Sequence, residues 1–191
     1  EAQRGNRIAR MQHLGLVPET IAPGPVPPTG WDALSPDEKA IEARKMEVFA
    51  AMVEELDRNV GRVLDALRKS GRLDDTVVIL LSDNGPDGNR FNRPLSHTDM
   101  RPLAVPYDNS LANIGAGNSY VAYGPAWAAA GAAPSRGLKG STTEGGIRVP
   151  MIVSGPGVAA GATSGPLGHV LDIPPAIADP AGAAPLPADG Q

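Results

Sequence analysis

The longest periodic pattern of apolar positions begins after Ser35 and predicts one long helix. Its apolar residues share one face and are separated by charged residues: Ile41, Phe49, Met52, Leu56, Val60, Leu64 and Leu67. Ser35 can cap the first turn, Pro36 fits the first helical position, and Glu38 can complete a capping box. Gly71 is placed to end the helix in a left-handed conformation. A helix of about 50 Å, at 1.5 Å per residue, needs a large body to pack against.

Two short apolar runs, at residues 77–81 and 149–154, predict strands. Neither run alternates apolar with polar residues, a pattern typical of strands that are covered on both faces in a parallel sheet. The order of these elements is typical of α/β proteins: a helix, a buried strand, a long excursion over residues 86–147 and a second buried strand. We therefore expect an α/β fold in which these strands belong to a large mixed or parallel sheet flanked by helices.

The remaining segments predict less regular structure. Residues 1–16 have the spacing of a short basic amphipathic helix, and the prolines of residues 18–28 exclude a regular element there. One short helix is expected within the excursion, between Pro125 and Gly131. Residues 179–191, rich in Ala, Pro and Gly, predict a linker or tail. Because the chain starts at Glu1 with no pattern of a signal peptide, we expect residues 1–191 to be part of a longer α/β domain.

Composition narrows the classes of function. With 41% apolar and 20% charged residues, the chain has the composition of a soluble globular protein. A net charge of −4 gives no basic footprint, so we expect no nucleic-acid partner. The longest apolar run is far shorter than the roughly 20 residues that span a bilayer. The absence of Cys excludes disulfides, thiolate metal sites and a cysteine nucleophile within these residues, and leaves the compartment open between cytoplasm and periplasm or exterior.

Asp83 and Asn84 follow directly after the first predicted strand. Ligands of open α/β sheets collect outside the carboxyl ends of strands. A carboxylate and an amide carbonyl are hard oxygen donors that suit Ca²⁺ or Mg²⁺, and Gly85 allows the turn that brings both to one ion. The alternative is a plain Asx turn, because Asp-Asn-Gly is a common turn sequence.

Lys139 is the second candidate. It lies between Gly137 and Gly140 and precedes the hydroxyl residues of Ser-Thr-Thr. A lysine ammonium on a flexible stem is a good partner for a tetrahedral oxyanion, and nearby hydroxyls and glycine N–H groups could add hydrogen bonds. The alternative is a solvated lysine in a flexible surface loop.

Several motifs in order resemble the sulfatase family of the alkaline-phosphatase superfamily, and bacterial arylsulfatases in particular. They are SDNG after an apolar strand and, after the excursion, a lysine followed by TTEGGIRVP and a second apolar run. The likeness extends through AMVEELDRNVGRVLDALRKSGRLDDT and YDNSLANIGAGNSYVAYGPAWA, and covers about residues 1–178. It implies that Asp83 and Asn84 hold Ca²⁺ rather than Mg²⁺ and that Lys139 contacts the sulfate of a small-molecule sulfate ester.

The resemblance also implies groups that these residues do not contain. The family's nucleophile is a formylglycine made from Cys or Ser in a C/S-x-P-x-R signature, which Ser135-Arg136 does not match. Two further aspartate ligands belong to an earlier strand, whereas Asp74-Asp75 stands at the entrance of the same strand as Asp83. We therefore expect the formylglycine outside this segment, the remainder of the same chain as a partner, and no activity from residues 1–191 alone. A phosphoester or phosphonate hydrolase and a non-catalytic fragment or paralogue stay as alternatives.

Histidines and aromatic residues leave further alternatives open. His13 is expected on the surface of the first helix. His97 is either a group on the substrate side or a plain loop residue, and His169 either orders the Asp-Ile-Pro turn that follows or takes part in catalysis. An aromatic group at three- and four-residue spacing either packs a short helix against the body or forms a platform for an aryl substrate: Tyr120, Tyr123 and Trp127.

Overall fold

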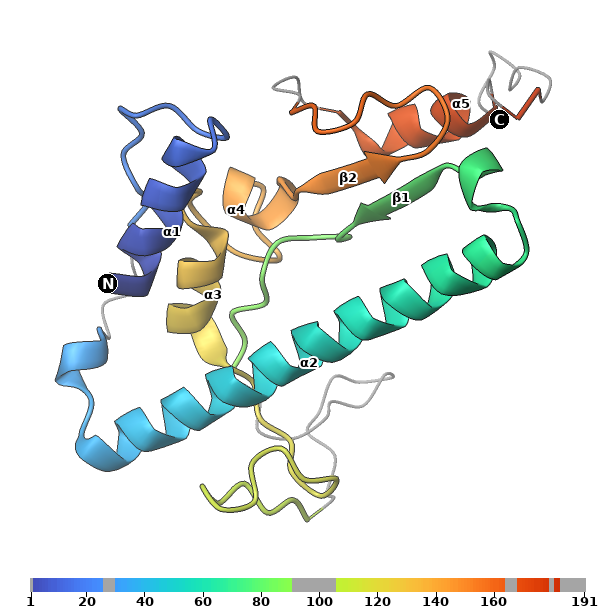
Figure 1. The fold of residues 1–191 in the computed structure, drawn as a ribbon. Coiled ribbons are helices and arrows are strands. Elements are labelled where there is room, and N and C mark those ends of the chain that lie inside the picture. Colours follow the sequence, from blue (N-terminus) through green and yellow to red (C-terminus); the bar gives the residue numbers. More distant parts are fainter. Residues whose placement is uncertain (1, 26–29, 91–105, 164–167, 179–180, 183–191) are drawn as a thin grey trace, which may run out of the picture.

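The computed structural model describes residues 2–25, 30–90, 106–163, 168–178 and 181–182 (Figure 1). The helices of these residues are α1 (Ala2–His13), α2 (Pro36–Lys69), α3 (Gly124–Ala132), α4 (Glu144–Ile147) and α5 (Ile173–Ala178). The strands are β1 (Val78–Leu81) and β2 (Met151–Ser154). Three short 3-10 turns lie at Trp31–Ala33, Leu73–Asp75 and Val170–Asp172. The helices predicted within residues 1–16 and near Pro125 are thus confirmed as α1 and α3.

The ends of α2 confirm the prediction of one long helix. The Ser35 hydroxyl accepts the N–H of Glu38 at 3.3 Å, and the Glu38 carboxylate accepts the N–H of Ser35 at 2.8 Å, which completes a capping box. At the other end Gly71 has φ 69° and donates to the carbonyl of Arg68 at 3.1 Å. The next N–H reaches the carbonyl of Leu67 at 2.9 Å, so the helix ends in a Schellman motif.

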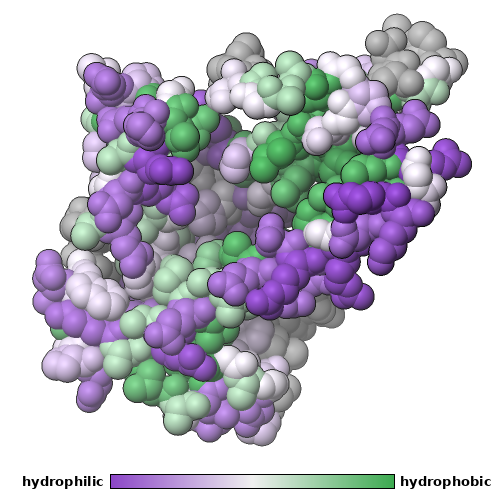
Figure 2. Space-filling view, in the orientation of Figure 1, coloured by the Kyte–Doolittle hydropathy of each residue, from purple (hydrophilic) through white to green (hydrophobic). Residues whose placement is uncertain are grey.

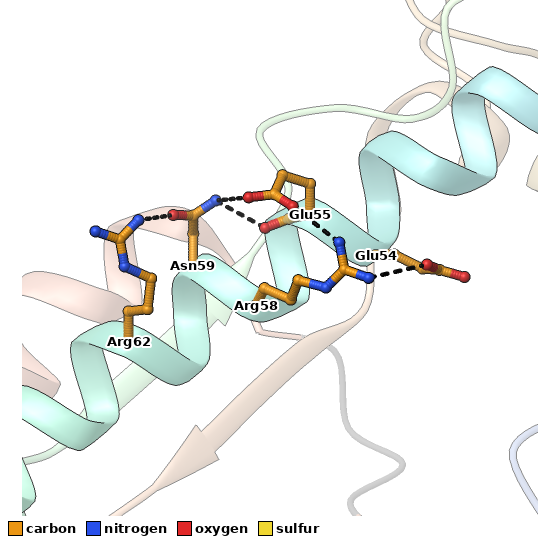
Figure 3. A network of polar contacts seen from close by, with 5 residues as sticks. All are labelled: Glu54, Glu55, Arg58, Asn59 and Arg62. Atoms are coloured by element: carbon orange, nitrogen blue, oxygen red, sulfur yellow. Dashed lines mark hydrogen bonds and ion pairs between the residues drawn. The ribbon is translucent and has the colours of Figure 1, made fainter.

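The two faces of α2 differ in character. On the polar face Arg58 pairs with Glu54 at 3.6 Å and with Glu55 at 3.1 Å, and Asn59 links Glu55 to Arg62 (Figure 3). Pairs at this spacing contribute about 0.2–0.5 kcal/mol each to an isolated helix. The opposite stripe is partly exposed, and no residue of α2 is buried among the described residues. Its exposed apolar side chains are Phe49, Met52, Val53, Leu56 and Val63.

The strands β1 and β2 pair with each other in antiparallel register, from Val78 opposite Ser154 to Leu81 opposite Met151. Within the described residues this two-stranded sheet stands alone. The expectation of strands covered on both faces is wrong here, since Leu81 and Ile152 are exposed. Apolar runs indicate what a strand can bury, but the described residues cover these strands only in part, with Val78, Ile79 and Val153 half-buried. Figure 2 shows the hydrophobic side chains gathered over the sheet.

The best-buried side chains lie away from the sheet. Helix α1 contacts α3, and α3 contacts α4, so these three helices gather at one side of the molecule (Figure 1). Ala128 and Ala129 of α3 are buried, as is Ile8 of α1. Small residues on α3 let the neighbouring backbones approach closely. The Arg4 guanidinium, also buried, donates to the carbonyl of Gly24 and ties α1 to the proline-rich segment.

The three aromatic residues singled out from the sequence pack against separate partners. Only Trp127 lies on α3, and its indole N–H donates to the carbonyl of Glu42 at 3.1 Å. Of the two alternatives, this arrangement supports a packing role for the three residues and not a shared platform for an aryl substrate. The ring pairs are Trp31–Trp127 at 5.8 Å, Phe49–Tyr123 at 4.9 Å and Tyr107–Tyr120 at 5.7 Å between centroids.

His169 orders the turn that follows it, one of the two alternatives left by the sequence. Its N–H donates to the Asp172 carboxylate at 2.6 Å, and its Nδ1 accepts the N–H of Leu171 at 3.1 Å. His97 and nearly all of the expected tail at residues 179–191 lie outside the described residues. Among the described helices, none combines the length and the apolar character that crossing a membrane requires.

Candidate functional site

Asp83 and Asn84 lie in a bend directly after β1. The Asp83 carboxylate is exposed, and no other described residue forms a hydrogen bond or ion pair with it. Asn84 is half-buried and donates its side-chain N–H to the carbonyl of Gly85 at 2.8 Å, which leaves its side-chain oxygen available. Within the described residues, neither Asp83 nor Asn84 forms an Asx turn. Asp87 does, because its Oδ1 accepts the N–H of Asn89 at 2.9 Å.

The segment after β1 crosses the turn before β2 at three glycines, and we call this contact of Gly85 with Gly145 and Gly146 the glycine crossing. Gly85, Gly145 and Gly146 are all buried, and the N–H of Gly85 donates to the carbonyl of Gly146 at 2.8 Å. A Cβ at Gly85 would come closer than 3.0 Å to the carbonyl of Gly145. Gly145 in turn donates to the carbonyl of Arg136 at 2.8 Å. Only residues without a side chain permit this approach of three backbones.

The same crossing carries Lys139. Its N–H donates to the carbonyl of Pro86 at 3.0 Å, and its Nζ lies 3.6 Å from Oδ2 of Asp87. Gly137 and Gly140, which flank it, have φ of 84° and 86°, so the loop turns sharply on either side of the lysine. The structure therefore brings Lys139 beside the strand end that bears Asp83 and Asn84.

Hydroxyl groups near Lys139 hold the loop together. The Ser141 hydroxyl donates to the carbonyl of Leu138 at 2.7 Å and lies 2.9 Å from the Thr143 hydroxyl. The Ser141 hydroxyl is therefore engaged within the loop. Beside the loop is an open cleft of about 510 Å³, lined by Arg136, Thr142, Thr143 and Glu144.

The fit of a divalent cation can be judged from the donor set. Asp83 offers a carboxylate without a partner among the described residues, and Asn84 offers a free amide oxygen. Ca²⁺ takes six to eight oxygen ligands. No cluster of three or more His, Cys, Asp or Glu that could hold a metal occurs in the part of the chain that the structure describes. The donor chemistry of the pair suits a divalent cation, but the two side chains alone would form only one side of such a shell.

Asp87 of this corner was missed from the sequence, whereas Tyr123 was singled out only as one of the aromatic residues. Asp87 lies in a Pro-Asp-Gly turn, and that signal indicates only the turn. Tyr123 packs against the same segment. Burial raises the pKa of its hydroxyl, a hydrogen bond with the Asp87 backbone acts in the opposite direction, and the Asp87 charge adds to the rise.

Comparison with known proteins decides the family. The model of the sulfatase family matches residues 17–183. The chain belongs to the sulfatase family. Membership confirms the resemblance drawn from the SDNG and TTEGGIRVP motifs and implies the alkaline-phosphatase-like α/β fold of that family, of which the described residues form a part.

The sulfatase relatives are longer than this chain. It is 50% identical over 157 residues to an uncharacterized sulfatase of Schizosaccharomyces pombe, covering 80% of this chain and 28% of that protein. It is 31% identical over 179 residues to the arylsulfatase of Klebsiella aerogenes, covering 92% of this chain and 38% of that protein. Human arylsulfatase A is 30% identical over 139 residues, which are 73% of this chain and 20% of that protein. The chain therefore spans well under half the length of these relatives.

Proposed function

We propose that the intact protein is an arylsulfatase-like sulfuric ester hydrolase that cleaves a small-molecule sulfate monoester. Membership of the sulfatase family and relatives named arylsulfatase support this proposal. The observation that carries it is the glycine crossing, because hydrogen bonds from Gly85 and Lys139 join the strand end to the lysine loop. An anion at this corner would meet a cation and two metal-ligating side chains together.

Asp83 and Asn84 are the proposed ligands of Ca²⁺. Mg²⁺ suits them less, because it demands near-ideal octahedral geometry and dehydrates reluctantly. When bound, Ca²⁺ would neutralise charge on the sulfate oxygens. The formylglycine nucleophile and the other metal ligands would come from outside residues 1–191, which contain neither Cys nor the S-x-P-x-R signature.

Lys139 is the proposed sulfate contact. Its backbone is tied to Pro86, whereas its side chain is 48% exposed and can meet a ligand while it pairs with Asp87. A positioned ammonium stabilises negative charge that develops on the sulfate oxygens and the leaving oxygen, and such preorganised charge is usually the largest single contribution to catalysis. Its flexible stem lets it follow the sulfate as the leaving bond lengthens.

A non-catalytic role is the alternative from another class of function. A protein that kept this corner without the nucleophile would bind sulfate esters and turn none over. A phosphoester or phosphonate hydrolase is the enzymatic alternative within the superfamily, and the TTEGGIRVP segment favours the sulfatase.

The test is an assay of the intact protein with 4-nitrophenyl sulfate and 4-nitrophenyl phosphate, with Ca²⁺ and with a chelator. We expect calcium-dependent hydrolysis of the sulfate ester. Lys139→Ala should lower kcat/KM by about 10²-fold or more, in line with the loss of one preorganised charge partner. Its thermal melt should match wild type, because Lys139 is an exposed loop residue.

Lys69→Ala is the matched control, since it removes an exposed lysine at the end of α2. Preference for the phosphate ester would replace the sulfatase by its superfamily alternative. Absence of turnover with either ester, with a folded protein, would favour the non-catalytic role. Normal kinetics for Lys139→Ala would show that Lys139 is only a solvated loop residue.

A further inference from the structure

Asp87 is oriented by two interactions, one for each carboxylate oxygen. Oδ1 accepts the N–H of Asn89 at 2.9 Å, which closes an Asx turn, and Oδ2 lies 3.6 Å from Nζ of Lys139. The turn restricts the side-chain torsions of Asp87, because the carboxylate is held against its own backbone. The second oxygen is left facing the lysine.

The backbones that carry these two side chains are joined as well. The N–H of Lys139 donates to the carbonyl of Pro86, the residue before Asp87. Beyond Asp87, a Cβ at Gly88 would come closer than 3.0 Å to Cδ1 of Leu138, so the two segments are in direct contact there. The ion pair is therefore the side-chain part of a junction whose backbone position is already set.

Folding gives little reason for this ion pair. Both side chains are more than 40% exposed, and ion pairs between exposed groups contribute little to stability. A lysine between two glycines, however, has a long flexible stem on a flexible loop. Catalysis by a charged group depends on that group being held near its working position before the reaction. A fixed carboxylate beside the ammonium supplies such a restraint.

We propose that Asp87 is a positioning residue for Lys139 in the sulfatase reaction. The proposal rests on the proposed function, in which Lys139 contacts the sulfate. An ammonium has three N–H donors, so one can point to Oδ2 of Asp87 while two remain for sulfate oxygens. Asp87 acts through the lysine and does not itself contact the reacting atoms.

The experiment compares Asp87→Asn with wild type in the intact protein. Asparagine retains an oxygen that can accept the N–H of Asn89 and removes the charge that faces Lys139. We expect kcat/KM for 4-nitrophenyl sulfate to fall about tenfold, which corresponds to a loss of about 1.4 kcal/mol of transition-state stabilisation. The dissociation constant of inorganic sulfate, measured by calorimetry, should rise severalfold, and the thermal melt should stay unchanged.

Two further variants separate positioning from a structural role. In a Lys139→Ala background, Asp87→Asn should have no added effect on kcat/KM or sulfate binding, because the residue it positions is gone. Asp87→Glu keeps the charge and should recover part of both. Glu55→Gln is the control, because it removes an ion pair with Arg58 on α2, away from the crossing.

The outcomes distinguish this inference from the proposed function. Normal kinetics and sulfate affinity for Asp87→Asn, with Lys139→Ala impaired, would overturn the role of Asp87 and leave the sulfate contact in place. An equal loss from Asp87→Asn with and without Lys139 would also overturn it. If Asp87→Asn fails to fold, Asp87→Glu decides: activity no better than that of Lys139→Ala, in a folded protein, rejects the proposal. Lys139→Ala with normal kinetics would instead reject the proposed function.

Discussion

Replacement of Gly85 by alanine would test whether the glycine crossing holds the candidate site together. Gly85 is buried, and its N–H donates to the carbonyl of Gly146 at 2.8 Å. The added methyl group would come closer than 3.0 Å to the carbonyl oxygen and carbon of Gly145. Since the atoms in its way belong to the backbone, no side chain can turn aside, and the two segments must separate.

The expected loss of stability follows from these two contacts. Overpacking of a close contact typically costs about 1–3 kcal/mol. Loss of the hydrogen bond adds about 0.5–1.5 kcal/mol. Together they reduce the free energy of unfolding by about 1.5–4.5 kcal/mol. Because the crossing joins the segment of Asp83 and Asn84 to the loop of Lys139, calcium affinity and kcat/KM should fall as well.

Urea unfolding of the intact protein, followed by circular dichroism, measures this loss. Gly61→Ala is the matched control, because a Cβ at Gly61 meets nothing within 4 Å and the residue lies in the interior of α2. The same chemical change should there stabilise the protein by about 0.5–1 kcal/mol. A Gly85→Ala protein as stable and as active as wild type would refute the reasoning, since the close approach would then have no energetic consequence.

Two further predictions concern α2 and the isolated chain. Ser35→Ala should lower the free energy of unfolding by about 1 kcal/mol, measured by urea unfolding, because it removes the hydroxyl that accepts the N–H of Glu38; an unchanged free energy of unfolding would contradict this. Hydrogen bonds from the Ser35 backbone and side chain lower the pKa of Glu38, so its contribution is present above the pKa of the unfolded chain and is lost as the pH falls through the folded pKa. Residues 1–191 alone should show no turnover of an aryl sulfate with Ca²⁺ and no micromolar calcium binding by calorimetry; robust turnover by a monodisperse sample would contradict the need for an external nucleophile.

The parts of the fold that could be predicted are those set by short stretches of sequence. The start of α2 depends on Ser35 and Glu38, three residues apart, and its end on Gly71. The turn at His169 depends on Asp172 in the same way. In each case the hydrogen-bond partners lie within a few residues of one another, so residue type and spacing are sufficient.

The pairing of the strands could not be predicted in this way. Whether β1 meets β2, and in which direction, depends on the path of the long excursion between them. The prediction that both strands are buried was wrong for a related reason. The apolar side chains of Leu81 and Ile152 are suited to a covered strand, but coverage depends on elements that the described residues do not supply. An apolar run therefore indicates a capacity for burial and leaves the partner undetermined.

In the candidate site, too, the residues in short motifs could be predicted and the contacts between distant segments could not. Asp83, Asn84 and Lys139 could be singled out because each stands in a short motif, whereas Asp87 could not, because only one of its two interactions is local. The hydrogen bonds that join the site's segments all run between backbone groups of this chain: Gly85 to Gly146, Lys139 to Pro86, and Gly145 to Arg136. The crossing can therefore take its shape without help from other segments. The proposed calcium shell cannot, because Asp83 and Asn84 would supply at most three of its six to eight oxygen ligands. Conditions that remove the metal should accordingly abolish ligand binding before they separate the lysine loop from the end of β1.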